Sequence, residues 1–182
     1  MSTDNTAAAA ARFIRDAAAV VRPGHLGRPR DPGDAWVEGE RGKFWGRFGA
    51  AGLLVSDAGR GVLLQHRAVW SHHGGTWGLP GGALHQGEDA VAGALREANE
   101  EAGVPAEKVS LLFTSVYDVG YWTYTTVVVE TLAPFEPVVS DPESLALEWV
   151  PLDRVDALEL HPGFGASWPA LRHRLPGPDA TS

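Results

Sequence analysis

The chain has 182 residues, the length of one ordinary domain or of one domain with a short extension. Hydrophobic residues make up 44% and charged residues 21%, so a hydrophobic core of ordinary size can form. Cysteine is absent, which excludes disulfides, thiolate metal sites and a cysteine nucleophile.

The formal net charge of −8 argues against a protein that binds nucleic acid or an anionic membrane, because both need a basic surface. No apolar run approaches the roughly 20 residues of a transmembrane helix. The N-terminus lacks the basic segment and long apolar stretch of a signal peptide. We therefore expect a soluble, cytoplasmic protein with neither nucleic acid nor membrane as a partner.

The first 43 residues predict an N-terminal extension. Alanine-rich residues 6–21 predict a short helix, and the Pro- and Gly-rich stretch 22–43 predicts an irregular strap. From residue 44 the pattern changes to alternating apolar runs and turn residues. Strands are predicted over 48–56, 62–66, 109–116, 121–130 and 145–150.

The remaining segments predict one long loop and two helices. Residues 68–87 are rich in glycine and predict a loop without regular structure. A helix is predicted over 88–102, ended by Gly103, and a short helical stretch follows Pro151. The last helix is predicted over 166–175, with a frayed tail after it. Several strands with few helices indicate an α+β or mixed α/β fold.

Two neighbouring stripes run along the predicted helix 88–102. At 100° per residue one stripe is apolar and faces the core, consisting of Val91, Ala94, Leu95, Ala98 and Ala102. Glu97, Glu100 and Glu101 form the second stripe, and their i,i+3 and i,i+4 spacing makes the carboxylates converge. Because convergent carboxylates repel, a divalent cation such as Mg²⁺ is the natural partner. The alternative is an exposed acidic helix face without a ligand.

The residues around this stripe resemble the Nudix box, G-x5-E-x7-R-E-U-x-E-E-x-G-U with U an apolar residue. The match runs from Gly82 through Glu88 and the pair Arg96-Glu97 to Gly103-Val104, and every fixed position agrees. The preceding segment 77–81 and the closing segment 148–152 also resemble the family, so the resemblance covers about residues 46–157.

The resemblance implies an α/β/α Nudix sandwich over residues 44–160, followed by a C-terminal helix and tail over 161–182. It implies hydrolysis of a nucleoside diphosphate linked to a group X. Mg²⁺ or Mn²⁺ would be held by Glu97, Glu100, Glu101 and the carbonyl of Gly82, while Glu88 and Arg96 would form a supporting ion pair. The family uses a glutamate from the box or from a separate loop as general base. The expected catalytic residues are therefore Glu100, Glu101 and Glu148, with Glu101 the first choice of base and Glu148 the second.

Three residues outside the box are candidates for substrate binding. Arg47 and Arg67 flank the first two strands, and Arg67 could reach a phosphate as a bidentate donor, the alternative being a surface arginine. Trp122 is the best candidate to stack on a nucleobase. The pair His72-His73 lies in the long loop, but no third metal ligand at suitable spacing is apparent, so contact with phosphate or no role is expected.

The resemblance allows three functions of different classes to be compared. The first is hydrolysis of a (d)NTP in house-cleaning, a nucleotide sugar, ADP-ribose or a dinucleoside polyphosphate. The second is a non-catalytic Nudix module that binds a nucleotide for regulation, but such modules typically lose box glutamates, and here all are present. The third, an isoprenoid diphosphate isomerase, relies on a cysteine that this chain lacks. We expect hydrolysis, and the resemblance also suggests a homodimer.

Overall fold

The computed structural model describes residues 31–176. Its strands and helices are β1 (Trp36–Gly39), β2 (Gly42–Trp45), β3 (Ala50–Asp57), β4 (Gly61–Arg67), β5 (Trp77–Gly78), β6 (Gly81–Ala83), α2 (Ala90–Ala102), η1 (Ala106–Lys108), β7 (Val109–Asp118), β8 (Thr123–Thr131), β9 (Ser144–Val150), η2 (Val155–Ala157) and α3 (Pro162–Arg174). β1 and β2 form a separate hairpin. The other strands form one sheet in the order β5-β4-β3-β8-β7, with β6 paired to β3 and β9 to β4.

The sheet is mixed. β3 and β8 run parallel from the pair Ala50↔Tyr124 to the pair Ser56↔Glu130, while the other strand pairs in the sheet are antiparallel. The central strand β3 is buried along almost its whole length, which explains its continuous run of small and apolar residues. A strand covered on both faces cannot show the polar alternation of a half-exposed one.

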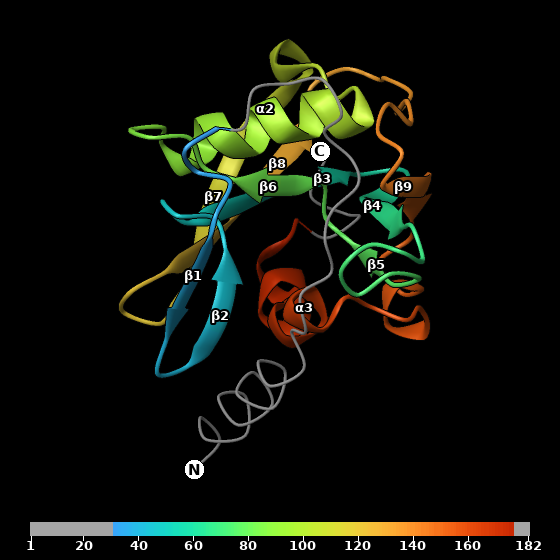
Figure 1. The fold of residues 1–182 in the computed structure, drawn as a ribbon. Helices are drawn as coiled ribbons and strands as arrows, with labels where there is room; N and C mark the ends of the chain where they lie inside the picture. Colours follow the sequence, from blue (N-terminus) through green and yellow to red (C-terminus); the bar gives the residue numbers. More distant parts are fainter. Residues whose placement is uncertain (1–30, 177–182) are drawn as a thin grey trace.

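Two helices cover opposite faces of the sheet (Figure 1). α2 packs with Leu53, Val55 and Leu63 on one face. α3 packs with Leu54 and Leu64 on the other face, where Trp168 is almost completely buried. Because successive strand residues point to opposite faces, neighbouring residues of β3 contribute to different cores. The fold is an α/β/α sandwich with a mixed sheet, as the resemblance implies.

The boundaries of α2 follow from its caps. The Asp89 side chain accepts hydrogen bonds from the backbone N–H groups of Val91 and Ala92 at 3.0 Å, so the helix begins at Ala90 rather than at Glu88. Gly103 ends it in the left-handed conformation at φ 64°, a position that favours glycine. The predicted apolar stripe does face the core: three of its alanines are buried and its two larger members pack against the same cluster.

The prediction of an irregular strap over residues 22–43 is wrong for its described part. Residues 36–45 form the β1–β2 hairpin, in which Trp36 pairs with Trp45. The hairpin crosses the expected domain boundary at residue 43. Four-residue strands with mixed burial give little sequence periodicity. The Pro- and Gly-rich composition therefore predicted irregular structure where two short strands form. The helix predicted over 6–21 and the end of the tail lie outside the described residues.

The segment 68–87 is not purely a loop, because it contains β5 and β6. α3 also begins four residues earlier than predicted, at Pro162, with His161 as its N-cap. The short helical stretch forms at η2 rather than immediately after Pro151. The start signal of α3 was in the sequence, since proline is favoured in the first helical turn.

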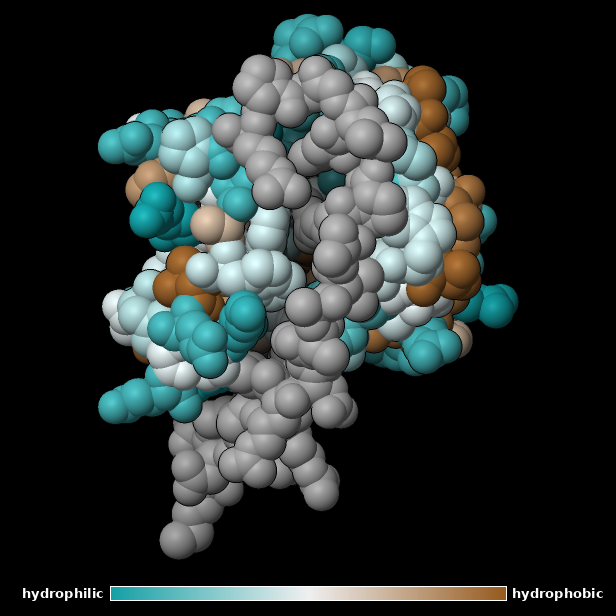
Figure 2. Space-filling model, viewed as in Figure 1, coloured by the Kyte–Doolittle hydropathy of each residue, from teal (hydrophilic) through white to brown (hydrophobic). Residues whose placement is uncertain are grey.

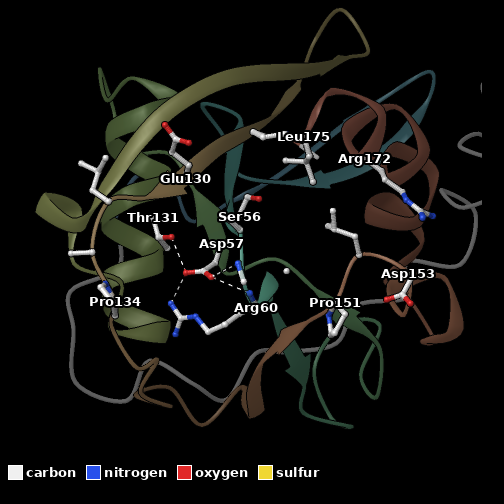
Figure 3. A pocket seen from close by; sticks show the side chains of 17 residues that line it. Ser56, Asp57, Arg60, Glu130, Thr131, Pro134, Pro151, Asp153, Arg172 and Leu175 are labelled. Carbon is white, nitrogen blue, oxygen red and sulfur yellow. Dashed lines mark hydrogen bonds and ion pairs between the residues drawn. The ribbon is translucent and has the colours of Figure 1, made fainter. Parts of the chain in front are cut away.

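The turn between β3 and β4 is held by Asp57 (Figure 3). Its carboxylate accepts a hydrogen bond from Arg60 Nη2 at 2.8 Å and one from Thr131 Oγ1 at 2.8 Å. These bonds, with the Arg60 guanidinium first, lower the pKa of Asp57 to about 2. A cavity of about 750 Å³ lies beside this turn and reaches the end of α3 at Leu175.

The described surface is mostly hydrophilic in the view of Figure 2, with hydrophobic side chains gathered along the edge where Figure 1 places β9. The exposed large hydrophobic residues of this region of the chain include Val138, Val139 and Leu145. No helix among the described residues is long and apolar enough to span a membrane.

Candidate active site

Two of the box carboxylates meet the glycines of β6. A Cβ built on Gly82 would lie 2.7 Å from the Glu97 carboxylate, so glycine is required for this approach. The backbone N–H of Gly81 donates to Glu101 Oε2 at 3.0 Å. β6 is in turn fixed by pairing with β3, and the sheet therefore positions the glycine backbone against α2. The third carboxylate, Glu100, is more exposed and lies 4.0 Å from Arg96 Nη1.

Glu88 and Arg96 join the loop before α2 to the helix. Arg96 Nε and Nη2 donate to the two Glu88 oxygens at 2.8 Å, a bidentate geometry, and Arg96 Nη1 donates to Glu97 Oε1 at 2.7 Å. Glu88 also accepts from the backbone N–H of His85. The Arg96 bonds lower the pKa of Glu88 to about 2. Arg96 thus orients Glu97 and anchors the loop at the same time.

Glu101 lies in the most enclosed part of the site. Gln65 Nε2 lies 3.4 Å from Glu101 Oε2 and donates to Ser144 Oγ at 2.6 Å. Burial, followed by the nearby Glu97 charge, raises the pKa of Glu101 to about 8. A carboxylate held near other carboxylates with few water contacts gains most from a bound cation or from a proton.

The donor set fits a hard divalent cation. Glu97, Glu100 and Glu101 offer carboxylate oxygens, and the Gly82 backbone approaches Glu97 so closely that its carbonyl can join them. Mg²⁺ and Mn²⁺ take such oxygen ligands, whereas no thiolate is available in the chain. This fit is supported by the absence of a side chain at Gly82, where a Cβ would fill the space next to the Glu97 carboxylate.

Glu148 is not brought to these carboxylates. Its neighbours Leu147 and Trp149 pack against the α2 core, so alternation along β9 directs Glu148 to the opposite face, where it is exposed. Asp141 is closer in electrostatic terms, because its charge contributes to raising the Glu101 pKa. The backbone N–H of Ser140 donates to the Glu101 carbonyl at 3.2 Å, which places this loop at the end of α2.

Of the two candidate arginines, only Arg67 lies near the carboxylates. Its charge acts on Glu101 and on Tyr124, whose pKa burial raises to about 12. Arg67 Nε donates to the His72 carbonyl at 3.1 Å. Arg47 is exposed in the turn after β2, and among the described residues no ion pair or side-chain hydrogen bond joins it to the box.

Trp122 packs with the β1–β2 hairpin. Its ring stacks on Phe44 with centroids 4.3 Å apart, and its Nε1 donates to the Trp45 carbonyl at 3.1 Å. One face of the ring is therefore occupied by protein. Trp77 stacks on His66 with ring centroids 4.6 Å apart, which is a packing contact.

A third histidine joins the pair in the loop, which sequence reasoning missed. One ring nitrogen each from His72, His73 and His161 lies within 4.8 Å of the others. His161 lies near the loop histidines because the segment before α3 pairs with β5 through a parallel bridge between Leu160 and Trp77. The His161 N–H donates to the Trp77 carbonyl at 2.7 Å. The separation of 88 residues along the chain left no local signal for this meeting.

Comparison with known proteins agrees with this architecture. The family model described as the NUDIX domain matches residues 46–171. A Mycobacterium tuberculosis protein named "Putative 8-oxo-dGTP diphosphatase 3" is 47% identical over 161 residues, covering 82% of this chain and 74% of its own. A Bifidobacterium longum "Nucleoside triphosphate pyrophosphatase/Nudix hydrolase fusion protein" is 42% identical, and the match covers 79% of this chain but only 32% of that protein.

Among solved structures, a Nudix hydrolase from M. smegmatis, RenU, is similar with a TM-score of 0.70 and 49% sequence identity. The match covers 78% of this chain and 94% of that one. A C. elegans Ap4A hydrolase shares the fold at a TM-score of 0.55 and 22% identity. The segment that matches the family model contains α2 with the box carboxylates and most of α3.

Proposed function

Because the chain belongs to the Nudix family and is a pyrophosphohydrolase, we propose that it hydrolyses nucleoside triphosphates, or other nucleoside diphosphates linked to X, with a divalent metal. Water adds to one phosphorus, the phosphoanhydride bond breaks, and the products are a nucleoside monophosphate and the phosphate of X. A (d)NTP is the favoured substrate, since the M. tuberculosis relative, of which the match covers 74%, is named for a deoxynucleoside triphosphate.

The single observation that carries this proposal is the meeting of Glu97 and Glu101 with the Gly81–Gly82 backbone. Glu97, Glu100, Glu101 and the Gly82 carbonyl would hold Mg²⁺ or Mn²⁺. When bound, the metal supplies charge neutralisation at the phosphates and a more acidic water. Arg96 fixes Glu97 in place, and Glu88 fixes Arg96.

We assign the general base to Glu101 rather than Glu148. Glu101 Oε2 accepts from the Gly81 N–H, and Gln65 Nε2 lies 3.4 Å from the same oxygen, so the orientation of the carboxylate is defined. The Glu148 side chain lies on the face of β9 that points away from α2 and from the box carboxylates. A base must reach the attacking water directly or through one other water, which favours Glu101.

The test is product release from a panel of nucleotides. The panel contains 8-oxo-dGTP, the ordinary (d)NTPs, ADP-ribose, nucleotide sugars and dinucleoside polyphosphates, each with Mg²⁺ and with EDTA in place of Mg²⁺. We expect turnover of at least one triphosphate that EDTA abolishes. Binding of nucleotides without any turnover would instead indicate a regulatory Nudix module.

A further inference from the structure

The histidine cluster (His72, His73 and His161) lies on the same face of the sheet as the box carboxylates. Gln65, which lies beside Glu101, pairs directly across from Gly78. A Cβ built on Gly78 would lie 3.3 Å from His161 Cβ and 3.9 Å from Arg67 Cδ. Residues paired across neighbouring strands share a face and are about 5 Å apart. The cluster is therefore one strand beyond the Glu101 site, with Arg67 beside it.

The hydrogen bond at the start of α3 decides which nitrogen of His161 carries the proton. His161 Nδ1 accepts from the backbone N–H of Gly163 at 3.2 Å, so in the neutral ring Nε2 carries the hydrogen and is a donor. Burial and the adjacent Arg67 charge lower the pKa of His161 to about 3, so the ring is neutral at pH 7. Burial also lowers the pKa of His73, and Arg67 adds to that effect.

These groups favour an anion over a metal ion. A cation at the cluster would be repelled by the Arg67 guanidinium, and His161 would have to give up its bond to Gly163 or lose its remaining proton. An anion would be attracted by Arg67 and would accept the Nε2–H of His161. The positive end of the α3 dipole, at the same residue, adds to this attraction.

We propose that Arg67 and His161, with His73 beside them, bind the phosphate of the substrate that lies farthest from the box carboxylates. The inference rests on the proposed function and deepens it: a site for a terminal phosphate selects nucleoside triphosphates over substrates whose X is a sugar. Arg67 supplies the charge and His161 a fixed donor, so His161 is a specificity-determining residue outside the Nudix box.

The substitution His161→Asn separates the proposed binding of phosphate from the structural role of His161 as the N-cap of α3. Asparagine is a favourable N-cap, so its side chain keeps the bond to Gly163 but has no donor at the position of Nε2. His173→Asn makes the same change on an exposed residue at the far end of α3 and is the matched control. Both variants should melt close to the wild-type temperature.

The decisive measurement is calorimetric binding of inorganic tripolyphosphate in Mg²⁺ buffer, which needs no turnover. We expect the Kd to rise on the order of tenfold in His161→Asn and to stay unchanged in His173→Asn. In steady-state kinetics, kcat/KM for a triphosphate should fall by the same factor while kcat/KM for ADP-ribose changes little. Wild-type and His161→Asn proteins with equal affinity for tripolyphosphate would overturn the proposal.

Two further outcomes are informative. If the wild type binds one equivalent of Zn²⁺ that His161→Asn does not bind, while tripolyphosphate affinity is the same in both, the cluster is a metal site and the proposal is wrong. If no nucleotide is hydrolysed but His161→Asn still weakens tripolyphosphate binding tenfold, the phosphate site stands and the proposed hydrolysis fails.

Discussion

At the scale of single residues, the site depends on an enclosed carboxylate, Glu101, that feels the charge of Glu97. Glu101 is enclosed, and its pKa is raised to about 8 by burial and by Glu97. Its folded-state pKa exceeds the ordinary value of 4.5, so its contribution to stability is fully present below pH 4.5 and is lost as the pH rises through about 8.

Glu101→Gln is therefore expected to stabilise the metal-free protein. In EDTA at pH 8 the free energy of unfolding should increase by roughly 1–3 kcal/mol, because a neutral amide replaces an enclosed charge. Urea unfolding at pH 5 and pH 8 measures the effect, which should be larger at pH 8. Glu107→Gln, a change on an exposed residue of η1, is the control. A destabilised Glu101→Gln protein would argue against carboxylate repulsion.

Gly82→Ala tests the close approach of the β6 backbone to the Glu97 carboxylate. The new Cβ would lie 2.7 Å from the Glu97 carboxylate and would displace it. A displacement of about 1 Å at such a site costs on the order of 100-fold in kcat. Gly59→Ala is the matched control, because its Cβ would meet nothing closer than an Asp57 oxygen at 3.7 Å. Steady-state kinetics with Mg²⁺ should show the loss in Gly82→Ala alone.

At the scale of elements, the turn between β3 and β4 depends on an ionised Asp57. Its pKa is lowered from 3.8 to about 2, so this stabilisation is present above pH 3.8 and is lost as the pH falls toward 2. Asp57→Asn should lower the free energy of unfolding at pH 7 by roughly 2 kcal/mol and flatten its dependence on pH between 4 and 2. Denaturant titrations across this range provide the measurement, with exposed Asp153→Asn as the control.

Elements with long periodic patterns could be predicted from sequence, and short ones could not. α2 was predictable because its apolar stripe spans three turns and Gly103 ends it. The long strands β3, β7 and β8 were also found within two residues at each end. β5 and β6 have two and three residues, too few for a period to show, and they owe their conformation to pairing with β4 and β3.

The part of the candidate site that depends on local sequence was predictable, and the part that depends on tertiary packing was not. The spacing of the box glutamates and the Glu88–Arg96 ion pair follow from one loop and one helix. The direction of Glu148 depends on which face of β9 meets α2, a tertiary choice. The meeting of His161 with His73 depends on how the segment before α3 pairs with β5, which no local pattern records.

At the scale of the whole molecule, the β1–β2 hairpin is attached to the sandwich through aromatic contacts. Phe44 stacks on Trp122, and the Tyr121 hydroxyl donates to the Gly42 carbonyl at 2.8 Å. This hairpin lies before the segment that matches the family model, which begins at residue 46. Its docking determines whether Trp122 serves packing or substrate binding.

We expect Trp122→Ala to lower the free energy of unfolding by about 1–3 kcal/mol, because the stack on Phe44 is lost. Phe44→Ala should have a similar effect, since it removes the other partner of the same contact. Both variants should keep the wild-type KM for a triphosphate within about threefold if the ring serves packing. A large rise in KM for Trp122→Ala alone would instead support the nucleobase contact expected from sequence.

Metal-dependent hydrolysis by the box carboxylates can be tested by a single comparison. It is kcat for wild-type and Glu101→Gln proteins on the best nucleotide of the panel, measured across a Mg²⁺ titration. We expect kcat to fall at least about 100-fold in Glu101→Gln, with no loss in Glu107→Gln. Wild-type turnover by a correctly folded Glu101→Gln protein at every Mg²⁺ concentration would contradict it.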